Sequence, residues 1–149
     1  MRKTIQLLSL AGALMFTTFG IAQNEVPKIE KSVVETLNTT PNLGFGVSQE
    51  RPLRSAFMMY EQMKANGVKF DNYEIVIWGM VVKDIAENKE LSSFLSKYMD
   101  EDLSVTVCSV AMDKLGVKAS DLPKGFKEVD DAYVRIFELQ ALGYNLVIP

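Results

Sequence analysis

Histidine is absent from this sequence, and cysteine occurs once, at Cys108. Without histidine, neither a Ser-His-Asp triad nor a Cys-His pair can form, which excludes the hydrolases and proteases that depend on them. A zinc site of the common cysteine and histidine type needs more such ligands than one cysteine supplies. A single thiol also cannot form a disulfide within the chain, so any fold must be stabilised by its core.

Basic residues are fewer than acidic ones and form no long run. The chain has 16 Lys and Arg against 19 Asp and Glu, and all of the acidic residues follow position 22. Nucleic-acid-binding domains carry a basic patch or stripe, and anionic membrane surfaces attract basic segments. We therefore expect neither nucleic acid nor a membrane surface as a partner of the chain beyond residue 22.

The first 22 residues have the pattern of an export signal. Arg2 and Lys3 precede an apolar run over 5–21, and Gly20-Ile21-Ala22 has the small residues of a signal-peptidase site, which would make Gln23 the mature N-terminus. The alternative is an uncleaved membrane anchor, since a spanning helix needs about 17–25 apolar residues. We predict a signal peptide over 1–22 and a periplasmic or secreted protein.

Beyond this segment, short apolar strands alternate with helical patterns. Residues 23–42 are predicted as an N-terminal arm or a short helix. Strands are expected at 43–47, 73–79, 103–108, around Val129 and at 144–148, and helices at 52–65, 81–86, 91–99, 109–115 and from Asp130 or Asp131 to Gly143. This order predicts one α/β domain over 43–149, a three-layer α/β/α sandwich of the flavodoxin-like class with a mostly parallel sheet of about five strands.

One face of the last helix is predicted to carry Tyr133, Ile136, Phe137 and Gln140, which recur at helical spacing. Glu74 begins its strand and is expected at the amino edge of the sheet.

Cys108 ends a predicted strand directly before a helix. Right-handed crossovers bring all carboxyl ends of parallel strands to one edge, where ligand crevices lie. A thiol there lies near unpaired backbone N–H groups and the positive end of a helix, which favour the thiolate. Cys108 is therefore a candidate reactive thiol, with Arg51, Gly79 and Ser109 as candidate ligand-binding neighbours, although a lone cysteine at a strand end is more often a small apolar core residue.

No pattern indicates a cofactor or a metal site. The segment "SQERPLR", 48–54, has one hydroxyl and bulky charged residues where a flavodoxin has a phosphate-binding loop. We expect no cofactor and no electron-transfer role.

A linked pattern runs from Cys108 to the last residue. Its positions are Val107-Cys108, Leu115-Gly116-Val117, Leu122-Pro123, Val129, Leu139-Gln140, Gly143-Tyr144 and Pro149. The segment 105–149 resembles the C-terminal half of the DsrE/DsrF-like family of small sulfur-trafficking proteins, and "YEIVIWGMVVKDI" resembles the family's second strand and glycine turn. Two positions depart from it: Trp78 stands where many relatives have histidine, and Ser109-Val110 replaces a small polar pair.

The resemblance implies an α/β/α sandwich that forms homo- or hetero-oligomers and a cysteine that carries a persulfide. The first hypothesis is a sulfur-relay protein in which Cys108 exchanges sulfane sulfur with a protein donor or acceptor. The second is a binding or assembly module without catalysis, in which Cys108 is buried packing. Trp78 is interpreted as a core residue or an oligomer contact.

Overall fold

The computed structural model describes residues 26–99 and 102–149, so the predicted signal peptide and its cleavage site lie outside the described residues. The strands are β1 (Asn42–Val47), β2 (Asn72–Ile77), β3 (Leu103–Cys108), β4 (Lys127–Val129) and β5 (Asn145–Val147). The helices are α1 (Lys31–Leu37), α2 (Glu50–Ala65), α3 (Val81–Glu87), α4 (Lys89–Ser96), α5 (Ser109–Leu115) and α6 (Ala132–Ala141). Within these two ranges, none of the helices has the length and apolar character needed to cross a bilayer.

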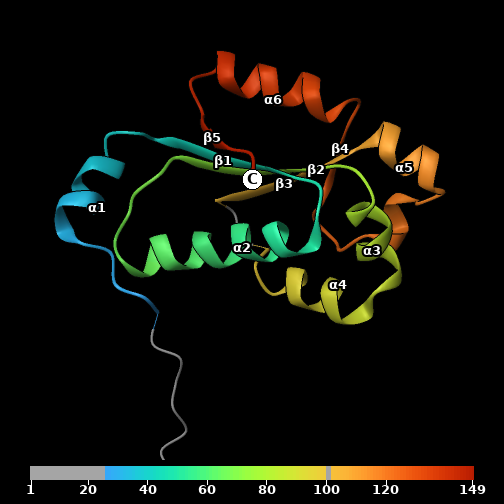
Figure 1. The fold of residues 1–149 in the computed structure, drawn as a ribbon, viewed down its shortest axis with the longest axis horizontal. Helices are drawn as coiled ribbons and strands as arrows, with labels where there is room; N and C mark the ends of the chain where they lie inside the picture. Colours follow the sequence, from blue (N-terminus) through green and yellow to red (C-terminus); the bar gives the residue numbers. More distant parts are fainter. Residues whose placement is uncertain (1–25, 100–101) are drawn as a thin grey trace, which may run out of the picture.

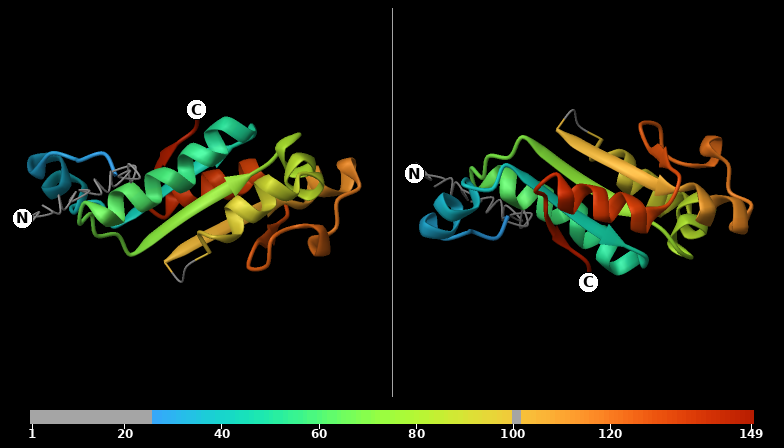
Figure 2. Two further views of the ribbon diagram at one scale, coloured as in Figure 1. Left: turned by 90° about the horizontal axis from the view of Figure 1, so that it is seen from below. Right: turned by 90° about the horizontal axis from the view of Figure 1, so that it is seen from above.

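Parallel strands form a single sheet in the order β4-β3-β2-β1-β5. The chain steps in one direction from β1 to β4, and then returns across the sheet to β5. Because crossovers are right-handed, the return connection must lie on the opposite face from the earlier ones. Figure 1 shows this arrangement, with α6 on one side of the sheet and α2, α3 and α4 on the other, and Figure 2 shows α6 alone over its face. The predicted α/β sandwich with a parallel sheet is confirmed.

Two apolar clusters fill the space between the sheet and its helices. The larger lies under α2, α3 and α4, and it includes Phe57, Ile75 and Ile77. The smaller lies under α6 and contains Val76 and Cys108. Alternate residues of β2 therefore enter different clusters, and because both faces are buried the strand appears in the sequence as an unbroken apolar run.

Two helix ends follow from local side-chain and backbone chemistry. Gly116 has a φ of +68° directly after α5, the left-handed conformation that ends many helices and that glycine adopts without steric cost. The Asp131 carboxylate accepts hydrogen bonds from the backbone N–H groups of Tyr133 and Val134, at 2.8 and 3.2 Å. Asp131, and not Asp130, therefore caps α6.

The N-terminal helix is short and lies at one end of the molecule. α1 has no buried residue. The residues before it are held by the end of α2, where Asn66 accepts a hydrogen bond from the Ile29 N–H at 2.9 Å and donates one to the Pro27 carbonyl at 3.0 Å. These polar contacts attach the arm to the domain, and the apolar side chains of Ile29, Val34 and Leu37 are half-buried there.

The predicted face of α6 is only partly buried. Ile136 is buried, but Tyr133 and Phe137 are 60% and 69% exposed, and Gln140 is exposed as well. The buried residues of this helix are Ala132, Ile136 and Leu139. Apolar side chains lie on both sides of α6, so spacing did not identify the buried side. That side is the one from which Arg135 reaches the sheet.

Arg135 and Glu74 form a buried ion pair between α6 and β2. Arg135 donates from Nε to Oε1 at 2.9 Å and from Nη2 to Oε2 at 2.7 Å, and Thr106 donates to the same carboxylate at 3.0 Å. The Glu74 side chain is only 3% exposed. Its hydrogen bonds raise the pKa of Arg135 above its ordinary value, so the guanidinium remains charged. Glu74 lies in the amino-terminal half of β2, as predicted.

We predict that Arg135→Ala lowers the free energy of unfolding by about 3 kcal/mol, because it leaves the Glu74 carboxylate buried without its partner. Urea unfolding followed by circular dichroism measures this change. Lys83→Ala is the control, since Lys83 and Glu87 form an exposed pair within one helix and the expected loss is below about 0.5 kcal/mol. Equal losses in the two variants would contradict a structural role for the buried pair.

Candidate functional site

Cys108 is the last residue of β3 and faces the α6 side of the sheet. It pairs in register with Val129 of β4 and packs in the cluster that contains Val76, Ala132 and Ile136. The residue is 5% exposed. It precedes α5 directly, but its side chain accepts no hydrogen bond from the first turn of that helix. The expected contact between the thiol and backbone N–H groups is therefore not formed.

The thiol borders a pocket of about 360 Å³ at the carboxyl edge of the sheet. Three segments line it: the end of β2, the end of β3 with α5, and the start of α6. The lining residues are Trp78, Gly79, Met80, Cys108, Val110, Ala111, Lys114, Leu115, Asp131, Ala132 and Tyr133. The helices that follow β3 and β4 leave the sheet in different directions at this point, which is where open α/β sheets form ligand crevices. The pocket therefore follows from the strand order.

Two aromatic rings form one wall of the pocket. The rings of Trp78 and Tyr133 are 5.6 Å apart between centroids and tilted by 54°. Trp78 is half-buried and lies close to Gly46 of β1, where a Cβ atom would be 3.1 Å from the indole ring and 3.1 Å from Cδ1 of Ile136. Gly46 thus allows the indole to lie against the sheet. Trp78 contributes to the pocket as well as to the packing predicted for it.

The pocket contains little charge. Lys114 is the one cation among the described residues that line it, and Asp131 is the one carboxylate. The Asp131 carboxylate already accepts two hydrogen bonds from the start of α6. The remaining lining residues are apolar, apart from the indole N–H and the Tyr133 hydroxyl, so the pocket favours an apolar ligand with little charge.

The structure gathers only some of the predicted site residues. Gly79 lines the pocket beside Cys108. Ser109 does not line it, and its hydroxyl instead donates to Glu128 Oε2 at 3.3 Å. Arg51 is exposed in the first turn of α2, on the other face of the sheet, and is not among the lining residues (Figure 1). Arg51, Ser109 and Cys108 follow or end strands at the same edge of the sheet, but they do not lie on the same face. A position at a strand end predicts the edge of the sheet and does not predict the face.

Arg54, the other basic residue near the first strand end, is also directed away from Cys108. Its guanidinium bonds to Glu50 Oε1 at 2.8 Å and lies over the Phe94 ring at 4.8 Å from the centroid. Sequence reasoning missed Lys114 and Tyr133 as pocket residues. Tyr133 follows the helix cap at Asp131, but only the return of α6 across the sheet brings it to the thiol.

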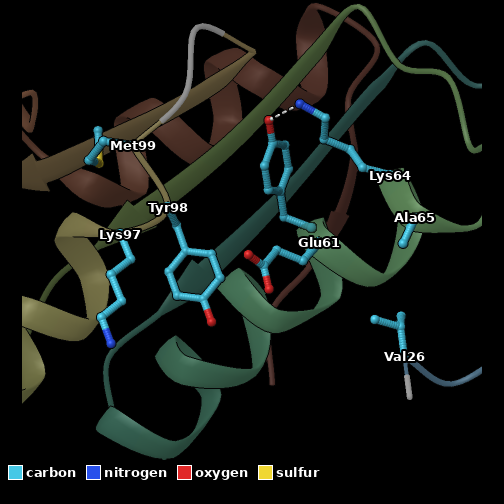
Figure 3. Close-up of a pocket in the computed structure, with 8 residues that line it drawn as sticks. Val26, Glu61, Lys64, Ala65, Lys97, Tyr98 and Met99 are labelled. Atoms are coloured by element: carbon cyan, nitrogen blue, oxygen red, sulfur yellow. Dashed lines mark hydrogen bonds between the residues drawn. The ribbon is translucent and has the colours of Figure 1, made fainter. Parts of the chain in front are cut away.

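A wider hollow of about 830 Å³ lies between α2 and the end of α4, on the face away from α6. Figure 3 shows Glu61, Tyr98 and Lys97 around it, with Lys64 donating to the Tyr60 hydroxyl at 3.2 Å. It is open to solvent, and the described residues that line it include no cysteine. Among residues 26–99 and 102–149, no group of cysteine and acidic side chains is arranged to hold a metal ion.

Comparison with known proteins supports the fold and leaves the chemistry open. No protein-family model matches the sequence. No curated protein matches it significantly either. Among solved structures, the chain is similar to a protein of unknown function, MTH1491 from Methanobacterium thermoautotrophicum, with 19% identity and a TM-score of 0.64 over 72% of this chain and 98% of that one.

It is also similar to a conserved protein of unknown function, BT1422 from Bacteroides thetaiotaomicron. The identity is 16% and the TM-score 0.62, over 75% of this chain and 97% of that one. These likenesses show that the fold of this chain also occurs in other proteins.

We predict that Gly46→Ala displaces the Trp78 ring, because the new methyl group would lie 3.1 Å from it. The expected loss of unfolding free energy is about 1–3 kcal/mol, as for other overpacked sites. Trp78 is the single tryptophan of the chain, so its emission spectrum reports the displacement directly.

The control for this prediction is Gly67→Ala. Gly67 has a φ of +81° and open space around it, so alanine there strains the backbone without touching the indole. We expect this variant to lose stability but to keep the Trp78 emission spectrum of the wild type. An unchanged spectrum in Gly46→Ala would show that the glycine does not position the ring.

Proposed function

We propose that this chain is a DsrE/DsrF-like sulfane-sulfur carrier in which Cys108 is the acceptor. The observation that carries the proposal is the position of the thiol: it ends β3 and borders a pocket of about 360 Å³ at the edge where ligands of parallel sheets bind. The resemblance of residues 105–149 to the family supports the same residue and the same chemistry. A carrier of this kind needs no histidine, no metal and no second cysteine.

The proposed step is a sulfur transfer that is balanced without an outside oxidant. The Cys108 thiolate attacks the terminal sulfur of a hydropersulfide donor, R–S–SH. A new sulfur–sulfur bond forms at Cys108 while the donor's sulfur–sulfur bond breaks, and its electron pair leaves with the thiolate R–S⁻. Cys108 then holds a persulfide, which an acceptor thiol removes by the same attack in reverse.

The polar environment of this step is limited to a few groups. Lys114 is the cation that lines the pocket, and it is suited to stabilise the departing thiolate. The apolar wall formed by Trp78 and Tyr133 limits water near the persulfide, which favours transfer over loss of sulfur to solvent.

The biological setting is part of the proposal. With residues 1–22 interpreted as a cleaved export signal, the carrier would act in the periplasm or outside the cell. Cys108 is 5% exposed, and this burial slows its oxidation in an oxidising compartment. A homo-oligomer is also proposed, and the exposed apolar side chains of Val134 on α6 and Leu142 at its end support a self-association surface.

The test is sulfuration of the purified protein. We expect wild-type protein treated with a hydropersulfide donor or polysulfide to gain one sulfur atom per chain, as measured by intact mass, and to release it to added thiol. Cys108→Ser should gain none. The absence of an adduct on the wild type, or an equal adduct on Cys108→Ser, would overturn the proposal.

A second candidate function is a binding or assembly module with an inert cysteine. Burial of Cys108 in the cluster under α6 favours it, as do the exposed aromatic residues of that helix. The two candidates predict different alkylation behaviour. A carrier should react with a small reagent such as iodoacetamide in its native state, whereas a packing cysteine should react only after denaturation, which peptide mass analysis of the labelled chain distinguishes.

A further inference from the structure

The chemistry of the pocket beside Cys108 restricts the sulfur carriers that fit it. Among the described residues, most of the lining is apolar, one wall is aromatic, and the one lining carboxylate is engaged by the backbone of α6. Hydrophilic sulfur carriers, such as glutathione and cysteine persulfides, bear carboxylates and an ammonium group that must lose water to enter. In the described part of the chain, Lys114 is the one cation that lines the pocket, and no guanidinium does. Burial of such charges without partners is costly.

The size of the pocket also limits which ligands fit it. At about 360 Å³ it lies at the lower end of the range of small-molecule sites, roughly 300–1,000 Å³. A benzyl or short alkyl group fits such a space, and it can lie against the Trp78 and Tyr133 rings, where aromatic contacts are favourable. The single negative charge of a thiolate or hydropersulfide anion complements Lys114.

We infer that the pocket recognises small organic thiols and hydropersulfides with an aromatic or aliphatic body and no further charge. This inference rests on the proposed function for its chemistry, but the binding of the apolar body to the Trp78–Tyr133 wall does not depend on sulfur transfer. The ligand's body contacts the aromatic wall, its sulfur lies at Cys108, and its charge lies toward Lys114. The sulfur-transfer step is the attack of the Cys108 thiolate on R–S–SH described for the proposed function, and R is here an apolar group.

Binding can be measured separately from transfer, because Trp78 is the single tryptophan and lines the pocket. The experiment titrates Cys108→Ser protein, which cannot form a persulfide at this position, with phenylmethanethiol and with reduced glutathione under reducing conditions. We expect saturable quenching of the Trp78 emission by phenylmethanethiol at concentrations at least about tenfold lower than for glutathione. Free N-acetyltryptophanamide, titrated in parallel, corrects for collisional quenching.

A matched pair of variants on α6 tests the location of the ligand. Tyr133 and Phe137 are both aromatic and both largely exposed, but only Tyr133 lines the pocket. In the Cys108→Ser background, Tyr133→Ala should weaken binding of phenylmethanethiol by about threefold to tenfold, whereas Phe137→Ala should leave it unchanged. Because both side chains are exposed, neither change is expected to unfold the domain.

The same preference should appear in transfer by the wild-type protein. Each donor's rate of sulfuration of Cys108 is divided by the rate at which the same donor reacts with a small free thiol, which corrects for its intrinsic reactivity. This ratio should be about tenfold higher for benzyl hydropersulfide than for glutathione hydropersulfide. If both donors sulfurate Cys108 at equal normalised rates and both thiols bind equally, the carrier function stands and the inferred selectivity is wrong. If neither donor sulfurates Cys108 but phenylmethanethiol binds as expected, the carrier function is wrong and the pocket assignment stands. Failure of phenylmethanethiol to quench Trp78 by saturable binding overturns the inference in every case.

Discussion

The return of the chain across the sheet between β4 and β5 is the constraint on which the rest of the structure depends. The order β4-β3-β2-β1-β5 and right-handed crossovers together require α6 to cover the opposite face from α2, α3 and α4. In the described part of the chain, α6 is the helix that covers that face, and its position shapes the pocket beside Cys108. The crevice beside Cys108 exists because the connections after β3 and β4 separate there.

Polar contacts hold α6 in place at two positions. Asp131 caps its first turn next to the pocket, and Arg135 binds Glu74 one turn later. The bidentate ion pair has a defined geometry, so it fixes the rotation of the helix more strictly than apolar contacts alone. It directs Ile136 into the core and leaves Tyr133 at the pocket, with Phe137 toward solvent. The buried pair and the pocket wall are therefore consequences of one helix orientation.

Glycine at position 46 connects the sheet to the same site. Its missing side chain leaves room for the indole of Trp78, which with Tyr133 forms the aromatic wall of the pocket beside Cys108. In the proposed function, this wall suits a site that binds apolar groups.

The sequence by itself determined the alternation of strands and helices, because buried parallel strands must be short apolar runs and helices must end at residues such as Gly116. It also determined that Cys108 ends a strand at the carboxyl edge of the sheet, and that no histidine assists it. Only the tertiary structure decided which face of that edge is used. Arg51, Ser109 and Cys108 share the edge, but strand pleating and the path of α6 separate them. Tyr133 lines the pocket beside the thiol from α6, which crosses the sheet to get there, and the buried side of α6 was set by a partner 61 residues away in sequence. Contacts of that kind depend on the three-dimensional path of the chain, which local periodicity does not contain.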